Sequence, residues 1–161
     1  MFEKIFEVPE APWKSSSRTA CRWVIIDENG MTPLLFVSRE NYYKLPGWWM
    51  EWDEDKIETL KREVKEETWC DIENIKEIWQ AIEKNSTRSQ TSYCFIWKVI
   101  KKWNTEYTAD EIYDWFALTW VKLDEALSVM RDIVPTTENG KRKQERESFI
   151  LEKAIEELSK N

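Results

Sequence analysis

The chain has 161 residues, of which 42% are apolar and 34% charged, and its formal net charge is −7. This composition predicts a single soluble globular domain over residues 1–161 and excludes a largely disordered chain. The acidic balance argues against a protein that binds extended nucleic acid through a basic surface. The sequence contains no histidine, which excludes Ser-His and Cys-His catalysis and any His-ligated metal site.

The N-terminal segment and the cysteines indicate the compartment. Residues 1–18 contain early acids and no long apolar segment, so they do not resemble a signal peptide. No apolar run approaches the ~18 residues that a membrane span requires. Cys21, Cys70 and Cys94 lack C-x-x-C spacing, which is typical of reduced thiols. We therefore expect a cytoplasmic protein with no membrane association.

The first half of the chain predicts two strands and a helix after an N-terminal extension at residues 1–18. Apolar runs at 21–27 and 33–40 flank a turn that contains Gly30, which predicts a β-hairpin. Residues 55–68 have apolar positions at helical spacing behind a D-x-x-E cap, which predicts a helix.

The second half predicts three more strands and two helices. The strands are expected at 74–84, 91–102 and 113–123, followed by a helix at 123–133 and a terminal helix at about 143–159. The segment 134–144 between these helices is expected to be a loop. Strands interrupted by helices predict an α/β fold in which helices cover a mixed sheet, with its core at about 19–135.

The helix predicted at 55–68 carries an unusual set of acids. At 100° per residue, Leu60 and Val64 define its buried stripe. Glu67 then lies at about −20° and Glu63 at about −60° from Leu60, with Glu66 further round at about −120°. These acids are like-charged i, i+3 and i+4 neighbours, and they lie near the helix C-terminus, where the macrodipole disfavours anions.

A divalent cation would offset these unfavourable interactions. Oxygen-only ligands favour Mg²⁺, with Mn²⁺ as an alternative, and Mg²⁺ commonly links carboxylates to substrate phosphates. The alternative is a solvated acidic face whose carboxylates pair with Lys61, Arg62 and Lys65.

The charged pattern resembles the Nudix box, G-x5-E-x7-R-E-U-x-E-E-x-G-U, where U is aliphatic. Aligned on "REVKEE" at 62–67, the box places Glu54 at its upstream acid and Cys70 at its last aliphatic position. Trp48 and Trp69 then occupy its two glycine positions. "LPG" before the box and "WVKLDEAL" after it are also similar to Nudix hydrolases, so the resemblance covers roughly residues 20–130.

The resemblance implies an α/β/α sandwich in which a loop–helix–loop holds Mg²⁺. Nudix hydrolases attack phosphorus with water and cleave a nucleoside diphosphate linked to another moiety, such as a nucleoside triphosphate. The expected activity is therefore that of a metal-dependent pyrophosphohydrolase, and the expected partner is a nucleotide or another nucleoside diphosphate derivative.

The resemblance also assigns roles within the helix. Glu63 and Glu67 would ligate the metal, and Glu66 would be either a further ligand or the base. Arg62, which lies near 200° on the same helical projection, points away from the metal. In Nudix hydrolases the arginine at this position orients the loop and a carboxylate, so Arg62 would do the same here. The alternative is that Arg62 forms a surface pair with Glu58 or Glu66.

Two acids outside the helix extend the expected metal site. Glu54 is either a ligand or an anion that the helix N-terminus favours. Nudix hydrolases often recruit a further acid from a later loop, and "TADEIYD" offers Asp110, Glu111 and Asp114. Of these three we select Glu111.

Three residues before the helix are candidates for substrate binding. Arg39 follows the second predicted strand, where related enzymes bind nucleotide, and Lys44 is nearby. Each of the two is otherwise a solvated flanking residue. Gly47 is expected to permit close approach of the backbone to phosphate.

Tryptophan is abundant where glycine is expected. The chain has 11 tryptophans and 3 glycines, whereas glycine ordinarily makes up about 7% of residues. The tryptophans at glycine-like positions are Trp48, Trp49, Trp52, Trp69, Trp79, Trp97, Trp103 and Trp115. We hypothesise that these are glycines whose UGA codons were translated with a code that reads UGA as tryptophan. If instead they are tryptophans, they stack on a nucleotide base or pack in the core.

Two other functions remain open at this point. One is a catalytically silent Nudix-fold domain that binds nucleotide or regulates a partner, in which tryptophans block the phosphate channel. The other is an acidic interaction domain without a nucleotide site, in which the resemblance of "REVKEE" is a coincidence.

Overall fold

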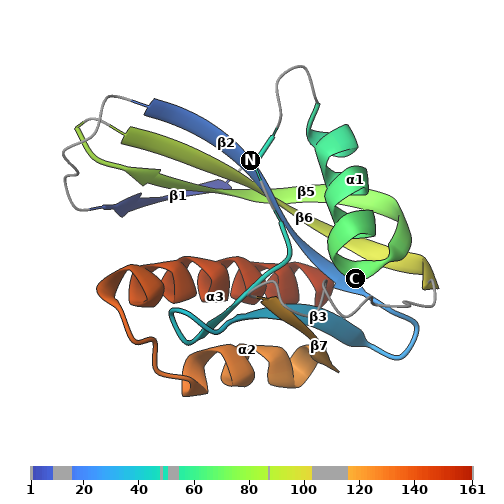
Figure 1. Cartoon of the computed structure of the whole chain (residues 1–161). Helices are drawn as coiled ribbons and strands as arrows, with labels where there is room; N and C mark the ends of the chain where they lie inside the picture. The colour runs from blue at the N-terminus through green and yellow to red at the C-terminus, as the bar shows by residue number, and fades with distance from the viewer. Residues whose placement is uncertain are drawn as a thin grey trace.

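The structure is a computed structural model of the chain, and it describes residues 2–8, 16–47, 49–50, 55–86, 88–102 and 116–160. The elements in chain order are β1 Phe2–Glu7, β2 Ser16–Ile26, β3 Met31–Val37, β4 Tyr42–Lys44, α1 Lys56–Thr68, β5 Cys70–Lys84, β6 Arg88–Lys102, β7 Phe116–Lys122, α2 Leu123–Asp132 and α3 Glu138–Leu158 (Figure 1).

The strands form two sheets of different kinds. The larger sheet has the order β1-β5-β6-β2; β5 and β6 are antiparallel, while β1 runs parallel to β5 and β2 parallel to β6. The smaller sheet is antiparallel and has the order β4-β3-β7. The mixed sheet expected from the sequence is therefore confirmed.

The predicted hairpin around Gly30 is only half correct. The turn forms, with Gly30 at φ 72° and the Asp27 amide 3.0 Å from the Met31 carbonyl oxygen. However, β2 belongs to the mixed sheet and β3 to the antiparallel sheet, so the two strands do not pair with each other. A turn signal fixes the reversal of the chain but not the pairing of the strands that leave it.

The mixed sheet has a helix packed on each face (Figure 1). Along β2 the side chains alternate: Cys21 and Trp23 pack towards α1, whereas Val24 belongs to the core shared with α2 and α3. In β6, Phe95 and Trp97 lie in the cluster with α1, and Cys94 and Ile96 in the cluster with α3. This arrangement is the expected α/β/α sandwich.

Helix α1 begins at a capping box and packs through an apolar stripe. Asp55 is the N-cap and accepts hydrogen bonds from the backbone amides of Ile57 and Glu58, and Glu58 completes the capping box. Leu60 and Val64 are fully buried against the mixed sheet. The helix predicted at 55–68 is confirmed.

Several elements differ from the sequence prediction. The strands β1 and β4 were not predicted, and β2 begins at Ser16 rather than at residue 21. α3 begins at Glu138, inside the segment predicted to be a loop, because Thr137 caps it by accepting from the Gly140 amide.

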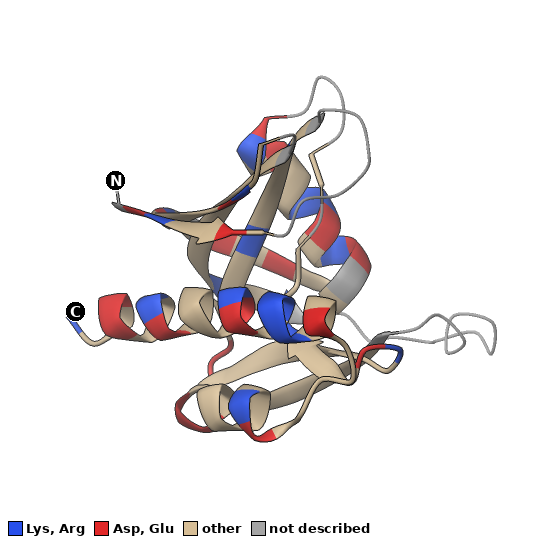
Figure 2. Ribbon diagram, turned by 90° about the vertical axis from the view of Figure 1, so that its left-hand side faces the viewer, with Lys and Arg blue, Asp and Glu red and all other residues tan. Residues whose placement is uncertain are grey.

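Basic and acidic residues are interspersed along α1 and α3 (Figure 2). Within the described residues, no helix is long and apolar enough to cross a membrane.

Candidate active site

The acidic face of α1 is half buried and half exposed. Glu63 has only 5% of its surface exposed, and the next residue, Val64, is fully buried. Glu66 lies further round the helix, and its side chain is 60% exposed. The structure therefore places Glu63 beside the buried stripe, as the helical projection predicts.

Arg62 connects these two acids. Its Nη1 lies 2.5 Å from Oε1 of Glu63 and 3.2 Å from Oε2 of Glu66. The prediction that Arg62 points away from the predicted metal ligands is wrong, because its flexible side chain folds back along the helix. The guanidinium bonds the buried Glu63 carboxylate and forms the expected surface pair with Glu66, while its role in orienting the loop stays a prediction.

The remaining predicted metal ligands lie partly outside the described chain. Glu54 and Glu111 are outside the described residues, and Glu67 is described only as part of α1, without its side chain. Among the described residues, no group of three or more His, Cys, Asp or Glu side chains is arranged to hold a metal ion. The donors that are described, the Glu63 and Glu66 carboxylates, are hard oxygen ligands on successive turns of one helix, and these suit Mg²⁺.

The segment that leads to α1 follows the free edge of β2. Pro46 accepts a hydrogen bond from the Trp23 amide at 3.3 Å, and the Met50 amide donates to Thr19 at 3.1 Å. Trp49 forms an isolated antiparallel bridge with Ala20. Because β2 is an edge strand, these contacts carry the chain from one face of the mixed sheet towards α1 on the other.

Gly47 is the tightest point of this segment. Its φ is 144°, and a Cβ there would lie 2.3 Å from the Cys21 carbonyl oxygen and 3.0 Å from Cα of Arg22. No other residue type fits this position without moving β2. Gly47 therefore allows close approach of two backbones within the protein, and its predicted contact with phosphate stays a prediction.

The two basic residues predicted to bind substrate lie in different environments. Lys44 ends β4, is only 6% exposed, and its charge contributes to lowering the pKa of Glu147 on α3. Arg39 is exposed, on the turn between β3 and β4. The structure therefore does not support describing Lys44 as a solvated flanking residue.

Trp69 caps α1 in a conformation that favours glycine. Its φ and ψ are 54° and 34°, in the left-handed region, and its amide donates to Lys65 at 3.1 Å. The side chain is 37% exposed. This geometry agrees with the glycine that the Nudix box has at this position.

Besides Trp49, which bridges to Ala20, the other tryptophans at glycine-like positions divide into three groups. Trp79 packs edge-on against Phe149, with ring centroids 5.5 Å apart, which is a role that glycine cannot fill. Trp97 is 1% exposed, and its Nε1 has no hydrogen-bond partner among the residues that the structure describes, which is unfavourable for a buried donor. Trp48, Trp52, Trp103 and Trp115 lie outside the described residues.

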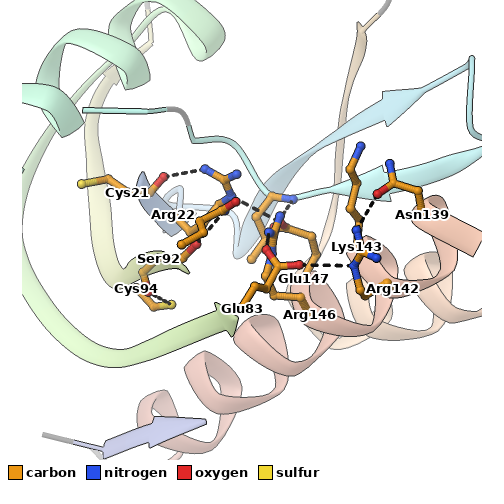
Figure 3. A network of polar contacts seen from close by, with 12 residues as sticks. Cys21, Arg22, Glu83, Ser92, Cys94, Asn139, Arg142, Lys143, Arg146 and Glu147 are labelled. Atoms are coloured by element: carbon orange, nitrogen blue, oxygen red, sulfur yellow. Dashed lines mark hydrogen bonds and ion pairs between the residues drawn. The ribbon is translucent and has the colours of Figure 1, made fainter. Parts of the chain in front are cut away.

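A buried charge network that the sequence prediction missed joins Arg22 of β2 and Glu83 of β5 to α3 (Figure 3). Glu147 of α3 is fully buried and accepts from Arg22 Nε at 3.2 Å and from Arg146 Nε at 3.1 Å. Arg146 also bonds Glu83, which Arg142 approaches at 3.6 Å. Burial raises the pKa of Glu147, but the charges of Arg146 and Arg22 outweigh it and hold the pKa below its ordinary value.

The helical pattern of α3 contained a signal for this network. Ile150 and Leu151 are buried, and Glu147 precedes them by three and four residues, so it lies on the same face. Arg146 precedes Ile150 by four residues. Charges that fall on an apolar stripe indicate a buried ion pair.

Comparison with known proteins agrees with this geometry. The sequence profile of the NUDIX domain matches residues 17–143. No relative among curated protein sequences matches the chain. Among solved structures, the MutT protein from Bacillus halodurans is similar at a TM-score of 0.54 and 22% identity, covering 70% of this chain and 72% of that one. The E. coli ORF135 protein is similar at a TM-score of 0.57 and 17% identity, covering 88% and 91%.

The two structural similarities are below 25% identity and therefore concern the fold. The profile match covers most of the chain and includes the loop, α1 and its acids. The chain therefore belongs to the NUDIX domain family, a family of phosphoanhydride hydrolases.

Proposed function

We propose that the chain is a Mg²⁺-dependent pyrophosphohydrolase that cleaves a nucleoside triphosphate or a related nucleoside diphosphate derivative, with Mn²⁺ able to replace Mg²⁺. The observation that carries this proposal is the buried Glu63 carboxylate on α1, held by Arg62 beside Glu66. Family membership supports the reaction class, and the side chains on α1 support the metal.

The charged residues of α1 are assigned different roles in this proposal. Glu63 and Glu67 would hold the cation, and Glu66 would be either a further ligand or the base. When bound, Mg²⁺ would supply charge stabilisation at the phosphate and a more acidic attacking water. Arg62 fixes the direction of the Glu63 carboxylate, and burial of Glu63 limits its alternative rotamers.

The remaining candidates are assigned to the substrate and to further ligands. Glu54 and Glu111 would complete the metal site, and Gly47, Lys44 and Arg39 would lie along the phosphate and nucleotide path. In the described structure, Gly47 and Lys44 lie near β2 and Glu147, whereas Arg39 is on an exposed turn.

The test is turnover of a nucleotide panel with Mg²⁺ and Mn²⁺ by Glu63→Gln and Glu67→Gln. We expect each variant to lose roughly a hundredfold or more in kcat, because loss of a ligand removes several kcal/mol of charge stabilisation. Glu152→Gln, at an exposed carboxylate of α3 paired with Arg131, is the matched control and should keep wild-type turnover.

Two outcomes would contradict the proposal. Unchanged turnover in both α1 variants would remove the metal role from these carboxylates. Nucleotide binding without hydrolysis by the unmodified chain, across the whole panel, would instead identify a catalytically silent nucleotide-binding domain.

A further inference from the structure

We propose that Glu147, acting with Arg22, is a positioning residue that sets, from the face of the mixed sheet opposite α1, the course of the loop at 45–47 and 49–50 that leads to α1. This inference rests on the proposed function for its catalytic consequence. Its structural part concerns how residues 45–47 and 49–50 are held, and this part is independent of any activity.

Glu147 bonds the first residue of the loop directly. Its Oε2 accepts from the Leu45 amide at 3.2 Å, while its Oε1 accepts from Arg22 Nε at 3.2 Å. Leu45 is fully buried in the core shared with α2 and α3, so this amide has no access to water. One carboxylate therefore joins α3, β2 and the start of the loop.

Arg22 extends the same link to Gly47. Its Nη1 donates to the Cys21 carbonyl oxygen at 2.9 Å, and this is the oxygen nearest to the position of a Cβ on Gly47. Cδ of Arg22 would also lie 3.0 Å from that Cβ. The Arg22 side chain thus forms part of the surface on which Gly47 rests.

The route of the chain explains why this link matters for α1. The loop starts beside Glu147, passes the edge of β2 through Pro46 and Trp49, and continues to α1 on the other face. Cys21 and Trp23, which flank Arg22 in β2, pack in the same cluster as Leu60 and Val64 of α1. β2 therefore contacts both the loop and α1, the helix that carries Glu63.

The network supplies a matched control. Glu83 is 6% exposed, bonds Arg146 and lies 3.6 Å from Arg142, so Glu83→Gln removes one buried negative charge from the same network. Within the described residues, its carboxylate contacts those two arginines and not the 45–47 segment. A purely structural role of the network predicts similar losses from Glu147→Gln and Glu83→Gln.

The experiment compares the two variants in the full chain. Hydrogen–deuterium exchange of peptides that cover residues 44–50 should be faster in Glu147→Gln than in Glu83→Gln, at matched fractions of folded protein. We expect kcat per folded molecule to fall roughly 10- to 100-fold in Glu147→Gln, because small displacements of catalytic groups have effects of this size. Glu83→Gln should retain kcat.

Each outcome decides the proposal. Equal exchange at 44–50 in the two variants, or an equal change in kcat, overturns it. If the unmodified chain hydrolyses no nucleotide, the proposed function fails, and the exchange comparison alone decides whether Glu147 positions the loop.

A second variant covers the case in which Glu147→Gln does not fold. Arg22→Lys keeps a positive charge beside Glu147 but removes the planar fork that reaches both Glu147 and the Cys21 carbonyl oxygen. It should show the same faster exchange at 44–50 and the same selective loss of kcat. Wild-type exchange and kcat in Arg22→Lys overturn the proposal.

Discussion

Nη1 of Arg62 lies 2.5 Å from Oε1 of Glu63. The same nitrogen is 3.2 Å from Glu66, so one guanidinium is shared by two carboxylates on successive turns of α1. The arginine lowers the repulsion between the two acids and fixes the direction of the buried one.

Replacement of Arg62 by lysine tests this orientation. An ammonium keeps the charge but lacks the planar, directional fork, so we expect kcat to fall roughly 10- to 100-fold, as for other residues that orient metal ligands. Steady-state kinetics at saturating Mg²⁺ measure the effect. Arg131→Lys, in an exposed pair with Glu152, is the control, and a wild-type kcat in Arg62→Lys would contradict the assigned role.

Gly47→Ala should destabilise the fold strongly. The new Cβ would lie 2.3 Å from the Cys21 carbonyl oxygen at a φ of 144°, so we expect a loss of about 3 kcal/mol in the free energy of unfolding. Gly30→Ala is the control: its φ is 72° and nothing lies within 4 Å of the added Cβ. That variant should lose only about 1 kcal/mol. Urea denaturation compares the two, and similar losses would contradict the steric argument.

Trp69→Gly should cost much less stability than deletion of a large, mostly covered side chain ordinarily does. The left-handed backbone at φ 54° costs a non-glycine residue about 1–2 kcal/mol, and glycine removes this cost while the variant loses the burial of the ring. We expect a urea midpoint close to that of the wild type. Trp79→Gly is the contrast: its ring packs on Phe149 and its backbone is in a β-strand, so we expect a loss of about 3 kcal/mol. Equal losses in the two variants would contradict the backbone argument.

The same backbone geometry bears on the glycine hypothesis. Peptide masses measured on protein from its own source should show glycine at positions 48, 49, 52 and 69. Tryptophan masses there, or UGG codons in the gene, would reject misdecoding. They would also favour a nucleotide-binding domain without turnover, because the loop would carry bulky residues where the phosphate approaches.

Glu40 should make the fold sensitive to acid. Partial burial raises its pKa, but hydrogen bonds from Lys143 and Asn139 outweigh this and lower the pKa below its ordinary value. Its stabilisation is therefore present above the unfolded pKa of about 4.3 and is lost as the pH falls through the lower folded value. Denaturation between about pH 5 and about pH 3 should show a shallower loss of stability in Glu40→Gln and in Lys143→Met. A wild-type slope in both would contradict this linkage.

Local signals in the sequence predicted the parts of the fold that local chemistry determines. The capping box of Asp55 and Glu58 located α1, and alternating apolar runs located β5 and β6. β1 was missed because its parallel partner β5 lies far along the chain, and no local pattern specifies that pairing. The start of α3 was missed because Gly140 disfavours helix, although Thr137 caps it.

The site was predictable to a similar degree. The spacing of Glu63, Glu66 and Leu60 predicted which acid lies beside the buried stripe. It did not predict the rotamer of Arg62, since a long side chain can reach several neighbours. Glu147 contacts Leu45 across 102 positions of sequence, and only the tertiary structure brings them together.

The position of Glu147 also bears on where the chain can be shortened. The family profile ends at residue 143, the sixth residue of α3, yet the carboxylate that neutralises Arg22 and the apolar residues Ile150, Leu151 and Ala154 come afterwards. A fragment trimmed to that boundary would bury an arginine without its counter-ion and open one face of the sheet to water. Helix α3 is thus part of the folded core of the domain. Its removal should also loosen the loop that begins at Leu45, because Glu147 would no longer accept a hydrogen bond from the Leu45 amide.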